Sequence, residues 1–282
     1  MISRLTGLVV LALALLSCEE NRVYRLATHQ ETTRLPRIGE DLAEVLRKDH
    51  GWRVKVLAGE SYNSVANIGK VASGEVDFAI SVSSAPADDS LDVRTVLPLY
   101  PEILVVLYKG DEVGRPDDLE ELLAGRRVGV GPKDSSYSQI MLQIIEAFGV
   151  DAGTFTPVHH PLNELDLEAM DVAFTFVGAN PTEIEKHIKA GARIFSFDDA
   201  ALDGKGSRVD GYLLKSPGFR SFIIPKSTFD EYPEEPVLTL AVTMTLISRG
   251  DMEPAMVYDF VSAVFNRSSA LFRKNPVLGF LS

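Results

Sequence analysis

Residues 125–150, GRRVGVGPKDSSYSQIMLQIIEAFGV, carry the pattern of a buried strand, a tight turn and an amphipathic helix. The segment 127–130 is a short apolar run flanked by glycines, which is typical of a strand end inside a sheet. Asp134, Ser135 and Ser136 follow the turn, and their side-chain oxygens suit the cap of a helix. Apolar residues then recur at four-residue spacing until a glycine that is placed to end the helix.

A turn of this kind directs backbone N–H groups and the positive end of a helix toward whatever lies above it. That geometry suits a carboxylate or a phosphate. The alternative is an ordinary strand–helix connection that binds nothing, and this stretch alone leaves both interpretations open.

The composition bounds the fold and the partners. A chain of 282 residues with 45% hydrophobic and 24% charged residues can form one large or two medium globular domains. The net charge of −12 argues against a nucleic-acid partner, because phosphate backbones are bound by basic surfaces.

The N-terminus has the features of a targeting segment. Arg4 precedes an apolar run over 5–16 that is too short for a comfortable membrane span. Cys18, the only cysteine, follows Leu-Leu-Ser and resembles the lipobox of bacterial lipoproteins. The resemblance implies a signal peptide over 1–17, lipidation of Cys18, and a periplasmic or extracytoplasmic protein held to a membrane by its lipid. The alternatives are a plain secretory signal or a buried core cysteine.

Strand and helix patterns alternate along the chain. The first elements are strands at 23–28, 52–57 and 76–82, with helices from residue 36 and over 61–73. Residues 93–108 predict two strands separated by a break at the prolines, and 198–218 predict loop and short turns. The remaining expected elements are helices over 116–124, 182–190 and 254–266, and strands over 155–158, 172–177, 193–197, 219–224 and 237–247.

Two βα-rich units joined by long strands, with a late segment that returns, indicate an α/β protein with two lobes around a ligand cleft. We expect residues 23–107 and 219–282 to form the first lobe and 108–218 the second. In such folds ligands bind between the lobes, outside the carboxyl ends of the strands.

No catalytic or cofactor motif stands out. A Gly-x-Ser-x-Gly elbow is absent, and Gly129-x-Gly131 begins a dinucleotide fingerprint whose third glycine position is Asp134. His159 and His160 have no ligand pattern nearby, which favours a solvated pair over a metal site. We therefore predict no metal, no cofactor and no enzymatic activity.

Several segments, taken together and in order, resemble the TAXI-type solute-binding proteins of TRAP transporters. The resemblance runs from about residue 23 to residue 276. The segments are SVAN at 64–67, SGEVD at 73–77, LYPE at 99–102, VGVGPKDSS at 128–136, FVGANP at 176–181 and TLAVTMTLISRGDMEPAMVYDFVSAVF at 239–265.

The resemblance implies a two-lobed periplasmic-binding-protein fold that closes on a small solute, glutamate-like or another small carboxylate, and delivers it to a TRAP-type permease. By position it implies that the cleft is lined or shaped by Thr28, His29, Thr32, Ser64, Asn67, Ser83, Tyr100, Glu102, Lys133, Ser135, Ser136 and Gly178. Hydroxyls, an amide and helix-start N–H groups can hold a carboxylate, and a glutamate can receive an ammonium. The same residues also have structural interpretations, as helix caps, a turn or helix-surface asparagine, and a strand corner.

Two loops differ from the family pattern. Residues 29–34, HQETTR, are bulky and charged where the family is glycine-rich, and 133–137, KDSSY, replace a Gly-Ser-Gly-Thr pattern. We predict that Arg34 or Lys133, if it faces the cleft, adds positive charge for an acidic ligand; the alternative is that both are solvated. A sensor or accessory lipoprotein of the same fold, and an enzyme on the same scaffold, are the alternatives to a transport role.

Overall fold

The computed structural model describes residues 22–31, 33–85, 88, 90–110, 116–133, 135–161, 165–178 and 182–281, and only the backbone of 182, 183, 280 and 281. The predicted signal peptide, Cys18, Thr32 and Asp134 lie outside these residues. Among the helices that the structure describes, none has the length and apolar character needed to cross a membrane.

The first half of the chain forms a βαβαβ unit, as the sequence predicts. Its elements are β1 (Val23–Ala27), α2 (Leu35–His50), β2 (Arg53–Leu57), α3 (Ser64–Ala72) and β3 (Phe78–Val82). β1 pairs in parallel with both β2 and β3, so α2 connects two neighbouring strands and α3 carries the chain from β2 past β1 to β3.

The start of α3 differs from the predicted start at residue 61. The side chain of Asn63 accepts a hydrogen bond from the N–H of Ala66 and caps the helix, so the first helical residue is Ser64. A capping asparagine two residues after the predicted start explains the difference.

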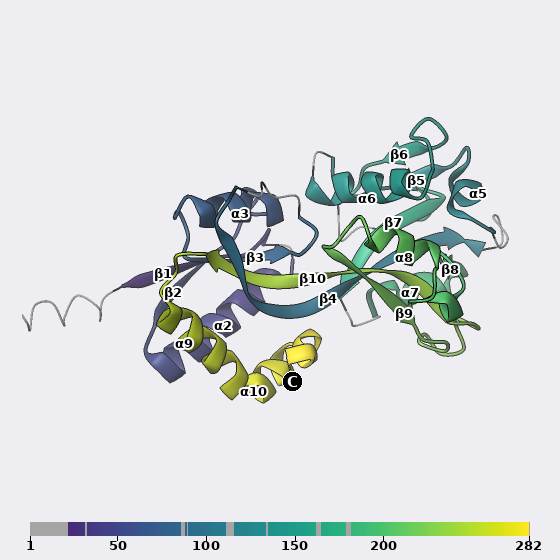
Figure 1. The fold of residues 1–282 in the computed structure, drawn as a ribbon. Helices are drawn as coiled ribbons and strands as arrows, with labels where there is room; N and C mark the ends of the chain where they lie inside the picture. The colour runs from purple at the N-terminus through teal and green to yellow at the C-terminus, as the bar shows by residue number, and fades with distance from the viewer. Residues whose placement is uncertain are drawn as a thin grey trace, which may run out of the picture.

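Two long strands, β4 (Val93–Lys109) and β10 (Val237–Arg249), run through both halves of the molecule and pair with each other in antiparallel fashion (Figure 1). The predicted break within 93–108 is wrong, because β4 is continuous over 17 residues. Pro98 and Pro101 face Thr245 and Thr243 of β10, on either side of a register shift between Met244 and Thr245. A local irregularity of this kind tolerates residues that lack an N–H donor.

The rest of the described chain completes one mixed sheet, in the order β2-β1-β3-β10-β4-β7-β5-β6, with β8 on β4 and β9 on β10. Its strands are β5 (Arg127–Gly129), β6 (Thr156–Val158), β7 (Val172–Gly178), β8 (Ala192–Ile194) and β9 (Phe219–Ile224). Its helices are α5 (Leu119–Leu123), α6 (Ser136–Ala147), α7 (Thr182–Lys189), α8 (Arg208–Leu213), α9 (Pro254–Asn266) and α10 (Ser268–Lys274), with 3-10 turns η2 (Ala200–Leu202) and η3 (Pro276–Leu281).

The strand–turn–helix predicted over 125–150 is confirmed. Gly131 turns the chain after β5 with a φ of 83°, and Ser135 caps α6 by accepting a hydrogen bond from the N–H of Ser138 at 3.1 Å. Gly149 follows α6 with a φ of 87°, as a helix-ending glycine should.

The prediction that residues 198–218 contain only loop and turns is wrong, since α8 lies within them. Ser207 and Asp210 form a reciprocal capping box at its start. This two-way cap stabilises a helix of 6 residues that is too short to show apolar periodicity.

Separate apolar clusters fill the two halves. Leu26, Phe78 and Phe260 belong to the cluster around α2 and α9, and Val128 and Phe174 belong to the one around α6. β4 and β10 each contribute to both clusters, with Leu97, Leu99, Met244 and Leu246 in the first and Leu104, Val106, Leu238 and Leu240 in the second. We propose that the lobes divide near residue 101 of β4 and residue 242 of β10. This division moves residues 102–107 and 219–242 from the first lobe of the sequence-based division to the second.

Asn67 supports the first lobe from inside. It is fully buried, rather than on the helix surface, and its Nδ2 donates to the carbonyl oxygens of Thr28 at 2.6 Å and Ile80 at 2.8 Å. We expect Asn67→Ala to lower the free energy of unfolding by about 2 kcal/mol or more, because two buried carbonyls lose their donor. Urea denaturation followed by circular dichroism measures this loss.

Asn266→Ala is the matched control, since Asn266 is an exposed residue at the end of α9. Its effect should stay within about 0.5 kcal/mol. Equal unfolding midpoints for the two variants would contradict the role assigned to Asn67.

Candidate functional site

A cavity of about 1270 Å³ is lined by residues from both halves of the molecule. Contributions come from the loop before α2 and its first turn, from β4 and β7, from the turn before α6, from α7 and from the segment after α10. The lining residues are His29, Gln30, Thr33, Arg34, Leu35, Arg37, Glu102, Pro132, Lys133, Tyr137, His159, His160, Pro161, Leu165, Thr175, Phe176, Val177, Gly178, Lys186, His187, Lys274, Asn275, Pro276 and Val277.

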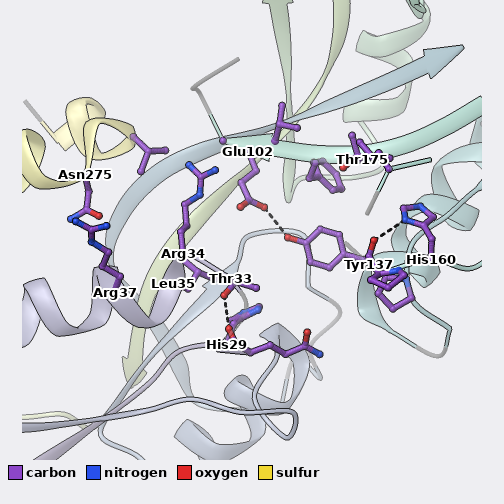
Figure 2. Close-up of a pocket in the computed structure, with 18 of the residues that line it drawn as sticks. His29, Thr33, Arg34, Leu35, Arg37, Glu102, Tyr137, His160, Thr175 and Asn275 are labelled. Carbon is purple, nitrogen blue, oxygen red and sulfur yellow. Dashed lines mark hydrogen bonds between the residues drawn. The ribbon is translucent and has the colours of Figure 1, made fainter. Parts of the chain in front are cut away.

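Glu102 lies on β4 close to the point where this strand passes from one half to the other, and it pairs with Gly178 of β7. The hydroxyl of Tyr137, in the first turn of α6, donates to Glu102 Oε2 at 2.9 Å (Figure 2). Burial raises the pKa of Glu102, while the bond from Tyr137 and the positive charge of Arg34 act in the opposite direction.

Arg34 precedes α2 and reaches toward the end of β7. A methyl group built on Gly178 would lie 2.9 Å from Arg34 Nη1 and 3.2 Å from Val277 Cγ2. The absence of a side chain at Gly178 therefore allows a cation of the first half and the segment after α10 to approach the end of β7.

Five cationic side chains line the cavity: Arg34, Arg37, Lys133, Lys186 and Lys274. Glu102 is the one acidic residue among the described lining residues. Lys274 is engaged by Asp41 at 2.7 Å and by Glu44. An acidic chain of net charge −12 thus presents a positive cavity, which favours an anion.

The N-terminus of α2 adds to this potential. Arg34 occupies the N-cap position, and its side chain makes no capping hydrogen bond, whereas α6 is capped by Ser135. Leu35 and Arg37 in the first turn of α2 both line the cavity. The first-turn N–H groups of this 16-residue helix carry partial positive charge, so they reinforce the cationic side chains.

Four of the five histidines in the sequence line the cavity: His29, His159, His160 and His187. His160 Nε2 accepts a hydrogen bond from the N–H of Gly131 at 3.3 Å, and its Nδ1 lies 2.8 Å from the carbonyl oxygen of Pro161. This arrangement assigns the proton to Nδ1 of a neutral ring. The predicted solvated pair is therefore wrong for His160, which is buried, while His159 is exposed.

His29 is also buried, and its Nε2 lies 3.3 Å from Ser64 Oγ. Burial lowers the pKa of His29 to about 4, so the ring is neutral at neutral pH. Across the described residues no group of three or more His, Cys, Asp or Glu side chains is placed to hold a metal ion.

The predicted site residues fall into two groups. His29, Glu102, Lys133 and Gly178 line the cavity. Thr28, Ser64, Asn67, Ser83, Tyr100, Ser135 and Ser136 lie outside its lining, and Thr32 lies outside the described residues. Direct contact of these eight residues with a ligand stays a prediction.

Several of the residues outside the lining hold the scaffold together. Thr28 Oγ1 donates to the carbonyl of Leu57 at 2.9 Å. Ser83 Oγ donates to the carbonyl of Gly218 at 2.6 Å and accepts from the N–H of Thr243 at 2.9 Å, which ties the end of β3 to β9 and β10. These hydrogen bonds fix the positions of the backbone segments that they join.

The sequence analysis missed Arg37, Tyr137, Lys186 and the segment 274–277. The sequence did contain a signal for Arg37. Arg34 and Arg37 lie on either side of Leu35-Pro36 at a helix start, a position where acidic residues are favoured over basic ones. Lys186 had none, since its place in the cavity depends on how α7 packs.

Residues 26–278 match the model of the NMT1-like family, which covers most of the chain. The chain belongs to the NMT1-like family. No curated protein matches it by sequence.

Solved structures show that this NMT1-like protein shares a widespread fold. It is similar to an ancestral arginine-binding protein bound to arginine, with a TM-score of 0.52, 15% identity, and coverage of 89% of this chain and 97% of that one. For the glutamate complex of the GluR0 ligand-binding core from Nostoc punctiforme the TM-score is 0.50 and the identity is 13%, with coverage of 89% of this chain and 98% of that one. For the effector-binding domain of a BenM variant the TM-score is 0.50 and the identity is 12%, with coverage of 91% of this chain and 97% of that one. The predicted two-lobed α/β fold of the periplasmic-binding-protein type is confirmed.

The raised pKa of Glu102 predicts a pH-dependent contribution to stability. The folded state keeps the Glu102 proton to higher pH than the unfolded state. This contribution to stability is therefore present below the ordinary glutamate pKa of 4.5 and is lost as pH rises through the folded pKa. Between pH 4 and pH 7 we expect the Glu102→Gln variant to gain free energy of unfolding relative to the wild type. Urea denaturation at the two pH values measures the difference.

Glu60→Gln is the control, because Glu60 is exposed in the turn before α3. Its difference from the wild type should be the same at both pH values. The same constancy for Glu102→Gln would show that burial does not perturb this carboxyl group.

Proposed function

We propose that this protein is a lipid-anchored extracytoplasmic solute-binding protein, which closes around a small anionic solute and delivers it to a TRAP-type membrane permease. The observation that carries the proposal is the cavity, whose described lining holds five cationic residues and one carboxylate from both halves of an otherwise acidic molecule.

The fold supports a binding role. Its similarity to an arginine-binding protein bound to arginine and to a GluR0 ligand-binding core in complex with glutamate indicates that this architecture occurs in proteins that bind small solutes. The anionic class of solute for this chain rests on its own charges. Four cations, Arg34, Arg37, Lys133 and Lys186, line the cavity together with Lys274, and Glu102 is the one acid among the lining residues that the structure describes.

The connection between the halves suits closure. Among the described elements, β4 and β10 alone contribute to both apolar clusters. Ser83, at the end of β3, adds hydrogen bonds to Gly218 and Thr243. Hinges of two-lobed binding proteins consist of a few residues in such crossing segments.

Delivery to a permease and retention by lipid rest on the resemblance to TAXI proteins and on the lipobox before Cys18. The BenM effector-binding domain has a similar fold, which favours a sensor or accessory lipoprotein as the second candidate. An enzyme is a weaker candidate, because Ser64, whose hydroxyl lies 3.3 Å from His29 Nε2, is buried outside the cavity lining.

Ligand binding is tested by thermal unfolding of the full-length protein in mild detergent against amino acids, 2-oxo acids and dicarboxylates. An anionic compound at 100 times its dissociation constant should stabilise the protein by about 2.7 kcal/mol, which raises Tm by a few degrees. If no compound raises Tm, the solute-binding proposal is wrong and the sensor role gains weight.

Membrane attachment is tested by Cys18→Ser. We expect the wild-type protein in the membrane fraction and the variant in the soluble extracytoplasmic fraction, because one acyl chain or more is lost. Ser17→Ala keeps a small residue before the cysteine and serves as the control. Release of both variants, or of neither, would count against the lipid anchor.

A further inference from the structure

The charged residues of the cavity are not all available to a ligand. Lys274 is held by Asp41 and Glu44. Glu102 accepts the hydrogen bond from Tyr137 and lies within the field of Arg34, whose charge opposes the rise in the Glu102 pKa. The charge of Lys274 is therefore balanced by Asp41 and Glu44, and the charges of Arg34 and Glu102 oppose each other.

Three cations remain outside those sets: Arg37 on α2, Lys133 before α6 and Lys186 on α7. In the described part of the chain none of the three forms an ion pair or a side-chain hydrogen bond. Arg37 comes from the first half and the two lysines from the second. Any approach of the halves brings these like charges together, which costs free energy unless an anion lies between them.

An amino acid would need an acceptor for its ammonium group. Glu102 is the one carboxylate that the described lining offers, and it already has a phenol donor and a neighbouring guanidinium. Burial also favours its neutral form, which weakens it further as a partner for a cation. The site therefore opposes a ligand ammonium group.

We infer that the solute is a multivalent anion without an amino group, bound across both halves by Arg37, Lys133 and Lys186. This inference rests on the proposed solute-binding function and names its substrate class. Polycarboxylates and phosphate-bearing carboxylates both carry several negative charges and no amino group, and the choice of probes distinguishes these two classes of solute.

The test is isothermal titration calorimetry on the full-length protein in mild detergent, with four probes. L-Glutamate and 2-oxoglutarate differ at one carbon, where the first carries an ammonium group and the second a ketone. Citrate represents polycarboxylates, and 3-phosphoglycerate represents phosphate-bearing carboxylates. We expect 2-oxoglutarate to bind at least about tenfold more tightly than L-glutamate, and citrate or 3-phosphoglycerate to bind more tightly still. Whichever of citrate and 3-phosphoglycerate binds more tightly identifies the class of solute.

Arg37→Gln and Lys186→Gln should each weaken binding of the tighter probe by about tenfold or more, since each removes a charged contact. Arg47→Gln, an exposed change on the same helix as Arg37, and Lys226→Gln, exposed after β9, are controls that should leave the affinity unchanged. Circular dichroism and thermal unfolding without ligand verify that every variant is folded.

Tighter binding of L-glutamate than of 2-oxoglutarate and citrate would overturn the inference while supporting the proposed function. Unchanged affinity in Arg37→Gln and Lys186→Gln would overturn it as well. Absence of binding by all four probes and by the wider panel of amino acids would overturn the proposed function itself, and the inference with it.

Discussion

The antiparallel pairing of β4 with β10 is the constraint on which the rest of the structure depends. These two strands run from one apolar cluster to the other, so the apolar side chains at each end of a strand pack into a different core. The register shift beside Pro98 and Pro101 lets the pairing of β4 with β10 continue although these two prolines have no backbone N–H to donate. Glu102 follows directly on β4, where β7 replaces β10 as the pairing partner, and this change places it opposite Gly178. Glu102 and Gly178 both line the cavity, so the pairing of β4 with β7 positions this part of its lining.

The charge distribution shows what the cavity costs the fold. Basic residues at a helix N-terminus oppose the helix dipole, so Arg34 and Arg37 are unfavourable for α2 taken alone. The end of α2 offsets this, with Arg47 and Lys48 in the last turn and Gly51 in the left-handed conformation. Local rules broken at one end of a well-formed helix are typical of a functional site, where binding rather than stability selects the residues. The same helix therefore serves both the core, through Ile38 and Leu42, and the cavity.

Local signals explain which elements could be predicted from the sequence. Ser135 and Gly149 bound α6 through contacts within a few residues, and the alternation of strands and helices before Val82 is sufficient to indicate parallel pairing. The continuity of β4 was not predictable from its prolines, because the partner β10 absorbs them through a register shift more than 130 residues away. α8 was missed since its stability comes from a capping box instead of a periodic face. In the cavity, Glu102 and Lys133 belong to local motifs, whereas Lys186 is brought there by the packing of α7.

The direction of polar side chains separates the predicted site residues that line the cavity from those that do not. Buried hydroxyls and amides must find partners inside the protein, and at strand ends the nearest partners are backbone groups. Thr28, Asn67 and Ser83 follow this rule and hold strands in place. A cation cannot be buried without a partner, so Arg37, Lys133 and Lys186 remain at the open space between the halves. Arg37 and Lys133 lie near helix starts, in the first turn of α2 and before α6, whereas Lys186 lies in the last turn of α7. A basic residue near a helix start is therefore the sequence signal that two of these three cations share, and the third is placed by packing alone.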